Sequence, residues 1–209
     1  MKKYILFDND GVLVETEAWY YQANYDILKT LDIHLAFEEY QKIMIRGGTA
    51  WELAFNQGYS LKEVENLKEK RDELYQHYLQ TKDITIAGIN ETLEELSKKY
   101  KMAIVTTSTR VNFELIHKNR GITKYMDFIL CVEDYERAKP HPEPYLKALE
   151  KFNATANEAI VVEDSQRGLD SAYNANIDCI IVKNEFTKSH NFNKAKHFID
   201  KFENLKELL

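Results

Sequence analysis

The sequence predicts an α/β protein: a parallel sheet covered by helices, with an all-helical segment inserted after the first strand. Three observations predict it. From about residue 84 onward, short apolar runs typical of strands alternate with helical stretches. One further strand-like run stands near the start, at Tyr4–Phe7. Between these parts, residues 16–81 contain no convincing strand.

Each predicted strand is a short apolar run: Tyr4–Phe7, Met102–Val105, Phe128–Val132, Ala159–Val162 and Cys179–Val182. The stretches between the later runs predict helices near 90–100, 110–120, 142–152 and 167–175. This alternation favours a parallel sheet with helices on both faces. The inserted segment predicts helices near 16–31, 36–45, 49–57 and 60–80. We therefore expect a core domain of residues 1–15 and 84–209 and a helical domain of residues 16–83.

The composition is that of an ordinary globular protein, with 44% hydrophobic and 30% charged residues. Lys and Arg number 28 against 34 Asp and Glu, and no long basic block is present, so we expect no nucleic-acid partner. No apolar run suits a membrane span or a signal peptide. We expect a cytoplasmic protein without a membrane partner, a monomer or weak homodimer, in which Cys131 and Cys179 are buried free thiols.

The first strand runs directly into Asp8, Asn9, Asp10 and Gly11. Side chains at positions i and i+2 of a strand share a face, so Asp8 and Asp10 can project together from its carboxyl end. Two converging carboxylates are costly to ionise together unless a cation joins them. The string therefore indicates a Mg²⁺ site with a carboxylate nucleophile and a neighbouring acid or base. Taken alone, it also fits an ordinary Asx-Gly turn.

Polar residues also follow the other strands. They are Thr106-Thr107-Ser108, Lys139 within Arg137-Ala138-Lys139-Pro140-His141-Pro142, and Glu163-Asp164-Ser165 followed by Gly168. Each has an ordinary interpretation, as a helix cap, a surface charge or a favourable charge at a helix start. Ligands of open parallel sheets bind beyond the carboxyl ends of the strands, where the strand order reverses. The combination predicts one site for a phosphoryl group at that edge.

In this order the motifs Asp-x-Asp-Gly, Thr, Lys-Pro-x-Pro and Glu-Asp-Ser-x-x-Gly resemble those of the haloacid dehalogenase superfamily. The resemblance spans nearly the whole chain and is strongest to the branch of sugar-phosphate phosphatases and β-phosphoglucomutase. It implies a Rossmann-like core with a helical cap, residues 16–83. It also implies that Mg²⁺ is held by Asp8, the backbone carbonyl of Asp10 and Asp164, with Glu163 in or next to the metal site.

The resemblance further implies that Asp8 attacks phosphorus to form an aspartyl-phosphate, while Asp10 protonates the leaving oxygen and then activates water. Thr106 and Lys139 would hold the transferring group. Elementary electrostatics agrees, because Mg²⁺ prefers carboxylate oxygens and a lysine supplies positive charge to phosphoryl oxygens. We also expect Lys139 to keep Asp8 ionised while Asp10 carries a proton.

Further substrate contacts are expected from Thr107, Arg46, Gly47, Thr49 and Arg110.

The expected reaction is hydrolysis of a small phosphorylated metabolite, a sugar phosphate in particular. The alternative is a hexose phosphate isomerase like β-phosphoglucomutase, which the Asp-Gly-Val string also resembles. Where that enzyme has a cap histidine and a cap arginine, this chain has Tyr20 and Ala50. A guanidinium clamp on the distal phosphate is then missing, unless Arg46 supplies it. A non-catalytic phosphate-binding module is a third possibility, which the complete set of motifs disfavours.

Overall fold

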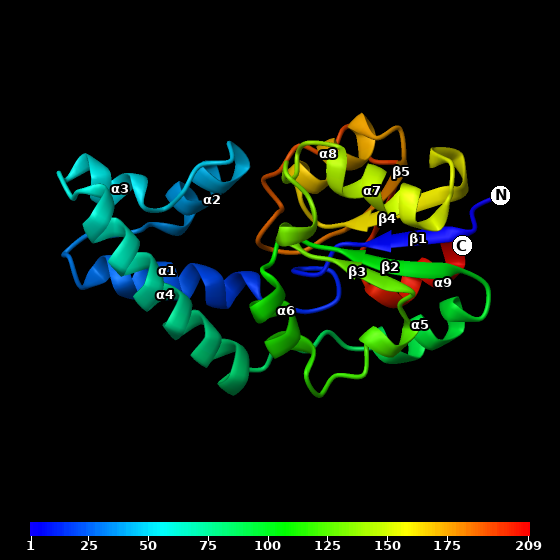
Figure 1. Ribbon diagram of the computed structural model, residues 1–209, viewed down its shortest axis with the longest axis horizontal. Coiled ribbons are helices and arrows are strands. Elements are labelled where there is room, and N and C mark those ends of the chain that lie inside the picture. Colours follow the sequence, from blue (N-terminus) through cyan, green and yellow to red (C-terminus); the bar gives the residue numbers. More distant parts are fainter. The chain divides into compact units, whose positions relative to one another are not determined.

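The computed structural model describes residues 1–209, and the chain divides into two compact units. One unit contains residues Met1–Glu15 and Thr85–Leu209, and the other contains residues Thr16–Ile84. Every strand belongs to the first unit, whereas the second consists of helices and their connections (Figure 1). We refer to them as the α/β unit and the helical unit.

The α/β unit is built on one six-stranded parallel sheet with the strand order β3-β2-β1-β4-β5-β6. The strands are β1 Tyr4–Phe7, β2 Lys101–Val105, β3 Phe128–Leu130, β4 Ala159–Glu163, β5 Asp178–Val182 and β6 His197–Ile199. The chain runs outward from β1 through β2 to β3, and then returns to the other side of β1 with β4. The strand order therefore reverses between β1 and β4, where open α/β sheets bind their ligands.

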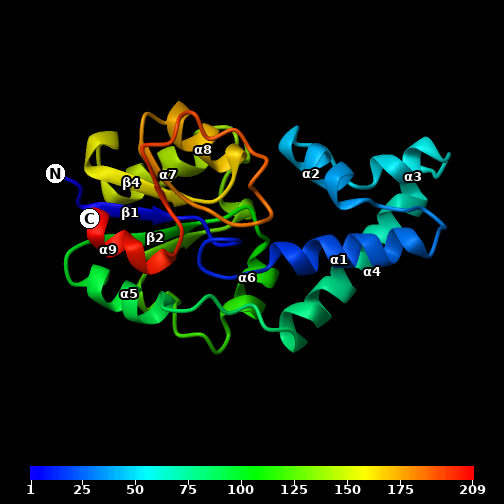
Figure 2. The ribbon, with the colours of Figure 1, turned by 180° about the vertical axis from the view of Figure 1, so that it is seen from behind.

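Helices cover both faces of the sheet, which confirms the predicted α/β fold (Figures 1 and 2). One face carries α7 Glu143–Phe152 and α8 Gln166–Asn174, and the other carries α5 Ile89–Ser97, α6 Arg110–His117 and α9 Leu205–Leu208. Four short 3-10 helices complete the unit: η1 Thr123–Tyr125, η2 Val132–Asp134, η3 Ala156–Glu158 and η4 Phe202–Asn204.

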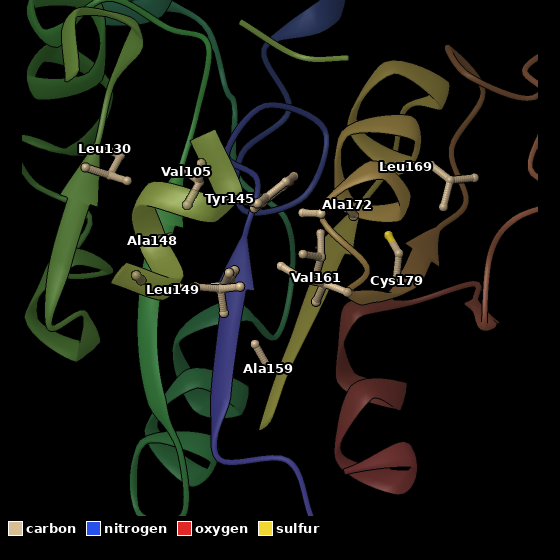
Figure 3. Close-up of a cluster of buried hydrophobic side chains, with 14 of the residues drawn as sticks. Val105, Leu130, Tyr145, Ala148, Leu149, Ala159, Val161, Leu169, Ala172 and Cys179 are labelled. Atoms are coloured by element: carbon tan, nitrogen blue, oxygen red, sulfur yellow. The ribbon is translucent and has the colours of Figure 1, made fainter. Parts of the chain in front are cut away.

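Alternation along β1 divides its side chains between two apolar layers. Leu6 joins a buried cluster with side chains from the neighbouring strands and from α7 and α8, including Tyr145 and Leu169 (Figure 3). Phe7, next in the chain, lies on the other face, where its ring is 5.7 Å from that of Phe202. Both residues are fully buried. Burying such a side chain contributes about 1.5–3 kcal/mol, so the two layers hold β1 firmly in the middle of the sheet.

The strand predictions differ from the structure at the sheet edge. Strand β3 ends at Leu130 rather than at Val132, because the chain turns there into the 3-10 helix Val132–Asp134. Strand β6 was not predicted. Only Ile199 is buried among its three residues, so this short edge strand has no apolar run that a pattern could detect. Cys131 and Cys179 are buried free thiols, as expected.

The helical unit contains α1 Glu17–Lys29, α2 Phe37–Ile45, α3 Glu52–Asn56 and α4 Leu61–Thr81. Its core includes Leu28, Tyr40 and Trp51, all of them almost fully buried. Helix α4 begins with a capping box in which Ser60 and Glu63 satisfy each other's backbone N–H groups. No helix in either unit is both long and apolar enough to cross a membrane.

Candidate active site

The predicted site residues of the α/β unit lie where its strand order reverses. Asp8 follows β1 and continues its pairing, since its N–H donates to the Val162 carbonyl of β4 over 2.9 Å. Glu163 ends β4 and Asp164 follows it. Thr106 comes directly after β2. Three segments that are far apart in the sequence therefore supply their polar side chains to one edge of the sheet.

Lys139 is the centre of this cluster. Its ammonium group is buried and donates three hydrogen bonds, to Asp8 Oδ1 over 2.7 Å, to Glu163 Oε1 over 2.7 Å and to the Val105 carbonyl over 2.8 Å. Burial alone would lower the pKa of Lys139, but Asp8 and Glu163 together raise it above its ordinary value. Lys139 is therefore a fixed positive charge at the carboxyl ends of β1, β2 and β4.

Asp8 is less readily ionised than the sequence suggested. Burial and the nearby Glu163 carboxylate raise its pKa to about 8, although the Lys139 ammonium acts in the opposite direction. Lys139 therefore favours the ionised form of Asp8, as the sequence suggests, whereas burial and the Glu163 carboxylate disfavour it. The physical reason is one of charge balance, because one ammonium group faces several carboxylates in a region that excludes water.

Glu163 is completely buried, and hydrogen bonds engage both of its carboxylate oxygens. Oε1 accepts from Lys139 and from the Tyr145 hydroxyl, the latter over 2.9 Å. Oε2 accepts from the Ser165 hydroxyl over 3.0 Å and from the backbone N–H groups of residues 164 and 165. A Cβ atom on Gly168 would lie 1.8 Å from the Glu163 carboxyl carbon. The glycine of the Glu-Asp-Ser-x-x-Gly motif therefore makes room for the glutamate.

Asp164 is buried beside the first motif. Its Oδ2 accepts a hydrogen bond from the Asn184 amide over 2.8 Å. A Cβ atom on Gly11, which has a φ of +77°, would lie 2.2 Å from the same oxygen. Gly11 is thus required both for the left-handed turn and for the close approach of Asp164. Oxygen atoms of Asp8, Glu163 and Asp164 all lie within 4.8 Å of one another, a spacing that could hold a metal ion.

Asp10 is held by the segment that follows β2. Its Oδ2 accepts hydrogen bonds from the Ser108 hydroxyl over 2.7 Å and from the Thr106 hydroxyl over 3.2 Å. Thr106 is buried, and its carbonyl accepts from the Tyr135 hydroxyl over 2.7 Å. Ser108 belongs to the polar string Thr106-Thr107-Ser108 but was not predicted to be a site residue. Its position two residues after Thr106 was the available signal.

Two further predicted contact residues of the α/β unit, Thr107 and Arg110, follow Thr106 in the chain. Thr107 is exposed, and Arg110 forms an ion pair with Asp134 while its backbone N–H donates to the Glu133 carboxylate over 2.9 Å.

In the helical unit, the exposed Arg46 pairs with Glu52. The same carboxylate accepts from the Thr49 N–H over 3.1 Å, and these bonds lower the pKa of Glu52. Gly47 has a φ of +75° and open space around it. Arg46, Gly47 and Thr49 therefore belong to one local loop that Glu52 organises.

Comparison with known proteins decides the family. A family model described as haloacid dehalogenase-like hydrolase matches residues 5–182. The chain belongs to this family. It is accordingly an enzyme of the haloacid dehalogenase-like hydrolases, and the resemblance inferred from the four motifs is confirmed.

Individual relatives agree with that assignment. The pyrophosphatase PpaX of Bacillus mycoides (strain KBAB4) is 28% identical over 195 residues, which cover 85% of this chain and 82% of the relative. The crystal structure of CbbY from Rhodobacter sphaeroides in complex with phosphate matches with a TM-score of 0.83 at 24% identity, covering 98% of this chain and 96% of that one. A β-phosphoglucomutase from Clostridium difficile matches with a TM-score of 0.79 at 24% identity, covering 98% and 93%. The two structural likenesses show the fold.

Proposed function

We propose that this hydrolase is a Mg²⁺-dependent phosphatase that releases phosphate from a small phosphorylated metabolite, with a sugar phosphate as the expected substrate class. The observation that carries the proposal is the buried cluster in which Lys139 bridges Asp8 and Glu163 at the point where the strand order reverses. The name of the PpaX relative supports phosphoryl chemistry, and it makes inorganic pyrophosphate a second candidate substrate.

The donor set suits a divalent cation of the magnesium type. Carboxylate oxygens of Asp8 and Asp164 lie close together, and hard oxygen ligands are those that Mg²⁺ prefers. The raised pKa of Asp8 points the same way, since a cation would offset the excess of negative charge around it. We assign the cation to Asp8, Asp164 and the backbone carbonyl of Asp10. Because Glu163 already accepts five hydrogen bonds, we assign it to holding Lys139.

In the proposed reaction an Asp8 oxygen attacks phosphorus, and the bond from phosphorus to the leaving oxygen breaks as Asp10 donates a proton to that oxygen. A water then attacks the phosphorus of the aspartyl-phosphate and gives its proton to Asp10. The bond to the Asp8 oxygen breaks, which regenerates both carboxyl groups and releases phosphate. Bound Mg²⁺ would neutralise negative charge on the carboxylates and the phosphoryl oxygens. Covalent catalysis divides one difficult displacement into two easier ones.

Other residues of the cluster hold the participants in place. Lys139 offers positive charge to the phosphoryl oxygens, and Thr106 and Thr107 offer hydroxyl groups. Ser108 and Thr106 direct the Asp10 carboxyl group. Phosphoryl transfer depends mainly on positioning and charge neutralisation, which is what a buried and extensively hydrogen-bonded cluster can supply.

We propose that the helical unit, residues 16–83, acts as a cap that selects the leaving group. Its Arg46, Gly47 and Thr49 are the proposed contacts, and the loop ordered by Glu52 supports treating them as one element. A contact from Arg110 would require its ion pair with Asp134 to open. A cap that excludes bulk water strengthens the electrostatic interactions within a site.

The mutase alternative rests on the Asp-Gly-Val string, and the cap sequence argues against it. Ala50 is almost fully buried in the core of the helical unit and carries no charge for a second phosphate. Tyr20 packs against Tyr75, with ring centroids 5.1 Å apart, where a mutase would place a histidine. Hydrolysis therefore remains the better supported reaction.

Phosphate release from a panel of sugar phosphates, other small phosphate monoesters and pyrophosphate tests the proposal, with and without Mg²⁺. The native chain is compared with Asp8→Asn and with Asp200→Asn, a control at an exposed carboxylate. We expect Mg²⁺-dependent release by the native chain and the control, and loss of release in Asp8→Asn. Interconversion of β-glucose 1-phosphate and glucose 6-phosphate without free phosphate would establish the mutase. Binding without turnover would establish a non-catalytic module.

A further inference from the structure

A neutral polar pair lies buried on the opposite side of the first motif from Lys139. Asn9, between the two aspartates, is fully buried, and its Oδ1 lies 2.7 Å from Nε2 of His117 at the end of α6. An amide oxygen can only accept, so His117 donates through its Nε2–H. Burial lowers the pKa of His117 to about 4, so the ring is neutral near neutral pH. The contact is a hydrogen bond between two uncharged groups.

Stability alone does not account for this pair. The Asn9 Nδ2 and the His117 Nδ1 atoms are both buried and have no hydrogen-bond partner. An unsatisfied buried polar atom is unfavourable, whereas replacing both members of a polar pair by apolar groups is close to neutral or stabilising. The surroundings would suit such a replacement, because the His117 ring lies against Phe113 with centroids 4.4 Å apart. A polar pair in such a place calls for a functional explanation.

The location of the Asn9–His117 pair suggests a functional explanation. The Asn9 carbonyl accepts the backbone N–H groups of Val12, Leu13 and Val14, so this residue anchors the loop that carries both aspartates. The segment 106–117 holds that loop at two points. Near its start Ser108 and Thr106 bind the Asp10 carboxylate, and at its end His117 binds the Asn9 side chain.

We propose that His117 is a positioning residue that, through Asn9, fixes the loop carrying Asp8 and Asp10 in the geometry needed for phosphoryl transfer. This inference rests on the proposed function. Asn9 lies between the proposed nucleophile and the proposed acid, so a shift of its backbone moves both. Small displacements of reacting groups reduce rates strongly. The hydrogen bond resists such displacements in a way that apolar packing, which has no direction, does not.

The test compares three variants with the native protein for melting temperature, kcat and KM. In the double variant Asn9→Leu/His117→Leu the polar pair is replaced by an apolar one. His117→Leu removes the donor alone, and His117→Gln keeps an N–H donor near the position of Nε2. The control is Thr92→Val on α5, where the Thr92 hydroxyl is also buried and unpartnered but lies outside the loop.

We expect the double variant to melt at or above the native temperature while its kcat falls about 10-fold to 100-fold, as for a misplaced reacting group. His117→Gln should recover much of the kcat that His117→Leu loses, and Thr92→Val should keep native kcat. A double variant with native kcat would overturn the proposal. So would a parallel fall in melting temperature and kcat without recovery by His117→Gln, because His117 would then have only a structural role.

A spectroscopic measurement separates this inference from the proposed function. Nitrogen-15 NMR of the His117 ring should report the Nε2–H tautomer in the native protein, with a shift of the Nε2 resonance in Asn9→Leu. If the native protein releases no phosphate from any substrate, the proposed function fails while the hydrogen bond is still observed. If phosphate is released but the Nε2 resonance is insensitive to Asn9→Leu, the inference alone fails.

Discussion

Asp8 and Asn9 are adjacent in the sequence, yet they lie in two very different environments. Asp8 faces a buried ion cluster in which Lys139 bridges two carboxylates. Asn9 faces a single neutral partner, His117, next to the ring of Phe113. The alternation of side chains along β1 continues into the motif and produces this division. One short loop therefore combines a side that is proposed to perform chemistry with a side that anchors it.

The two sides should also respond differently to substitution. In an ion cluster, removal of one partner leaves a buried charge uncompensated, which is strongly destabilising. A neutral pair can be exchanged for apolar residues at little cost in stability. The charged side therefore couples stability to activity, whereas the neutral side should allow the two to be separated.

The largest effect is expected for Lys139→Met. Loss of the ammonium leaves Asp8 and Glu163 facing each other, so the free energy of unfolding should fall by about 3–5 kcal/mol. Phosphate release should fall about 10²–10³-fold, the range for loss of one stabilising donor. Urea unfolding at pH 8 and phosphate assays measure both, with Lys183→Met at an exposed ion pair as control. Native stability of Lys139→Met would contradict the account of the charged side.

Gly168→Ala should be the next most disruptive change. The new Cβ would overlap the Glu163 carboxylate, which costs about 1–3 kcal/mol of unfolding free energy, partly offset by about 1 kcal/mol of helix propensity. Displacement of the Glu163 carboxylate should also shift Lys139, which it binds, and so lower the rate of phosphate release. Gly58→Ala is the control. It has open space and a φ of +91°, so it should cost only backbone strain of about 1–2 kcal/mol and leave activity unchanged. Equal activities of the two variants would refute the role given to Gly168.

Burial of the neutral His117 ring should make the stability of the protein depend on pH. Its pKa is lowered from 6.5 to about 4 by burial, so between these values the unfolded chain binds a proton that the folded protein excludes. The free energy of unfolding is therefore unaffected by this group above pH 6.5. It falls as the pH is lowered from 6.5 toward 4, by up to about 3 kcal/mol. Urea unfolding between pH 4 and 7 should show a smaller dependence in His117→Gln. Identical slopes would show that His117 is not buried as a neutral ring.

Arg46→Ala should have the smallest effect on stability, below about 1 kcal/mol, because its ion pair with Glu52 is exposed. As a proposed substrate contact it should instead raise KM, with little change in unfolding. Kinetics with the best substrate of the phosphate-release panel measure this, and Lys29→Ala, another basic residue of the helical unit, is the control. An unchanged KM would remove Arg46 from the proposed cap contacts.

The sequence could predict those site residues whose types form an unusual pattern, but not those whose role depends on tertiary contacts. Asp8, Lys139 and Glu163 were selected because charged residues at strand ends form an unusual pattern. Ser108 and His117 were not predicted to be site residues, because a serine before a helix and a histidine within one are common. Their partners, Asp10 and Asn9, are brought to them only by the tertiary structure. The raised pKa of Asp8 depends on burial, which residue types alone do not specify. The localisation and oligomeric state stay predictions.

The most direct test of the central claim is to trap the proposed aspartyl-phosphate. During turnover with the best substrate and Mg²⁺, rapid quenching and borohydride reduction convert an aspartyl-phosphate to homoserine, which mass spectrometry locates in the chain. We predict homoserine at position 8 in the native protein and in Asp200→Asn, and none in Asp8→Asn. Homoserine at another position would contradict the account. So would an unmodified Asp8 in native samples quenched before steady state, if Asp8→Asn also still releases phosphate.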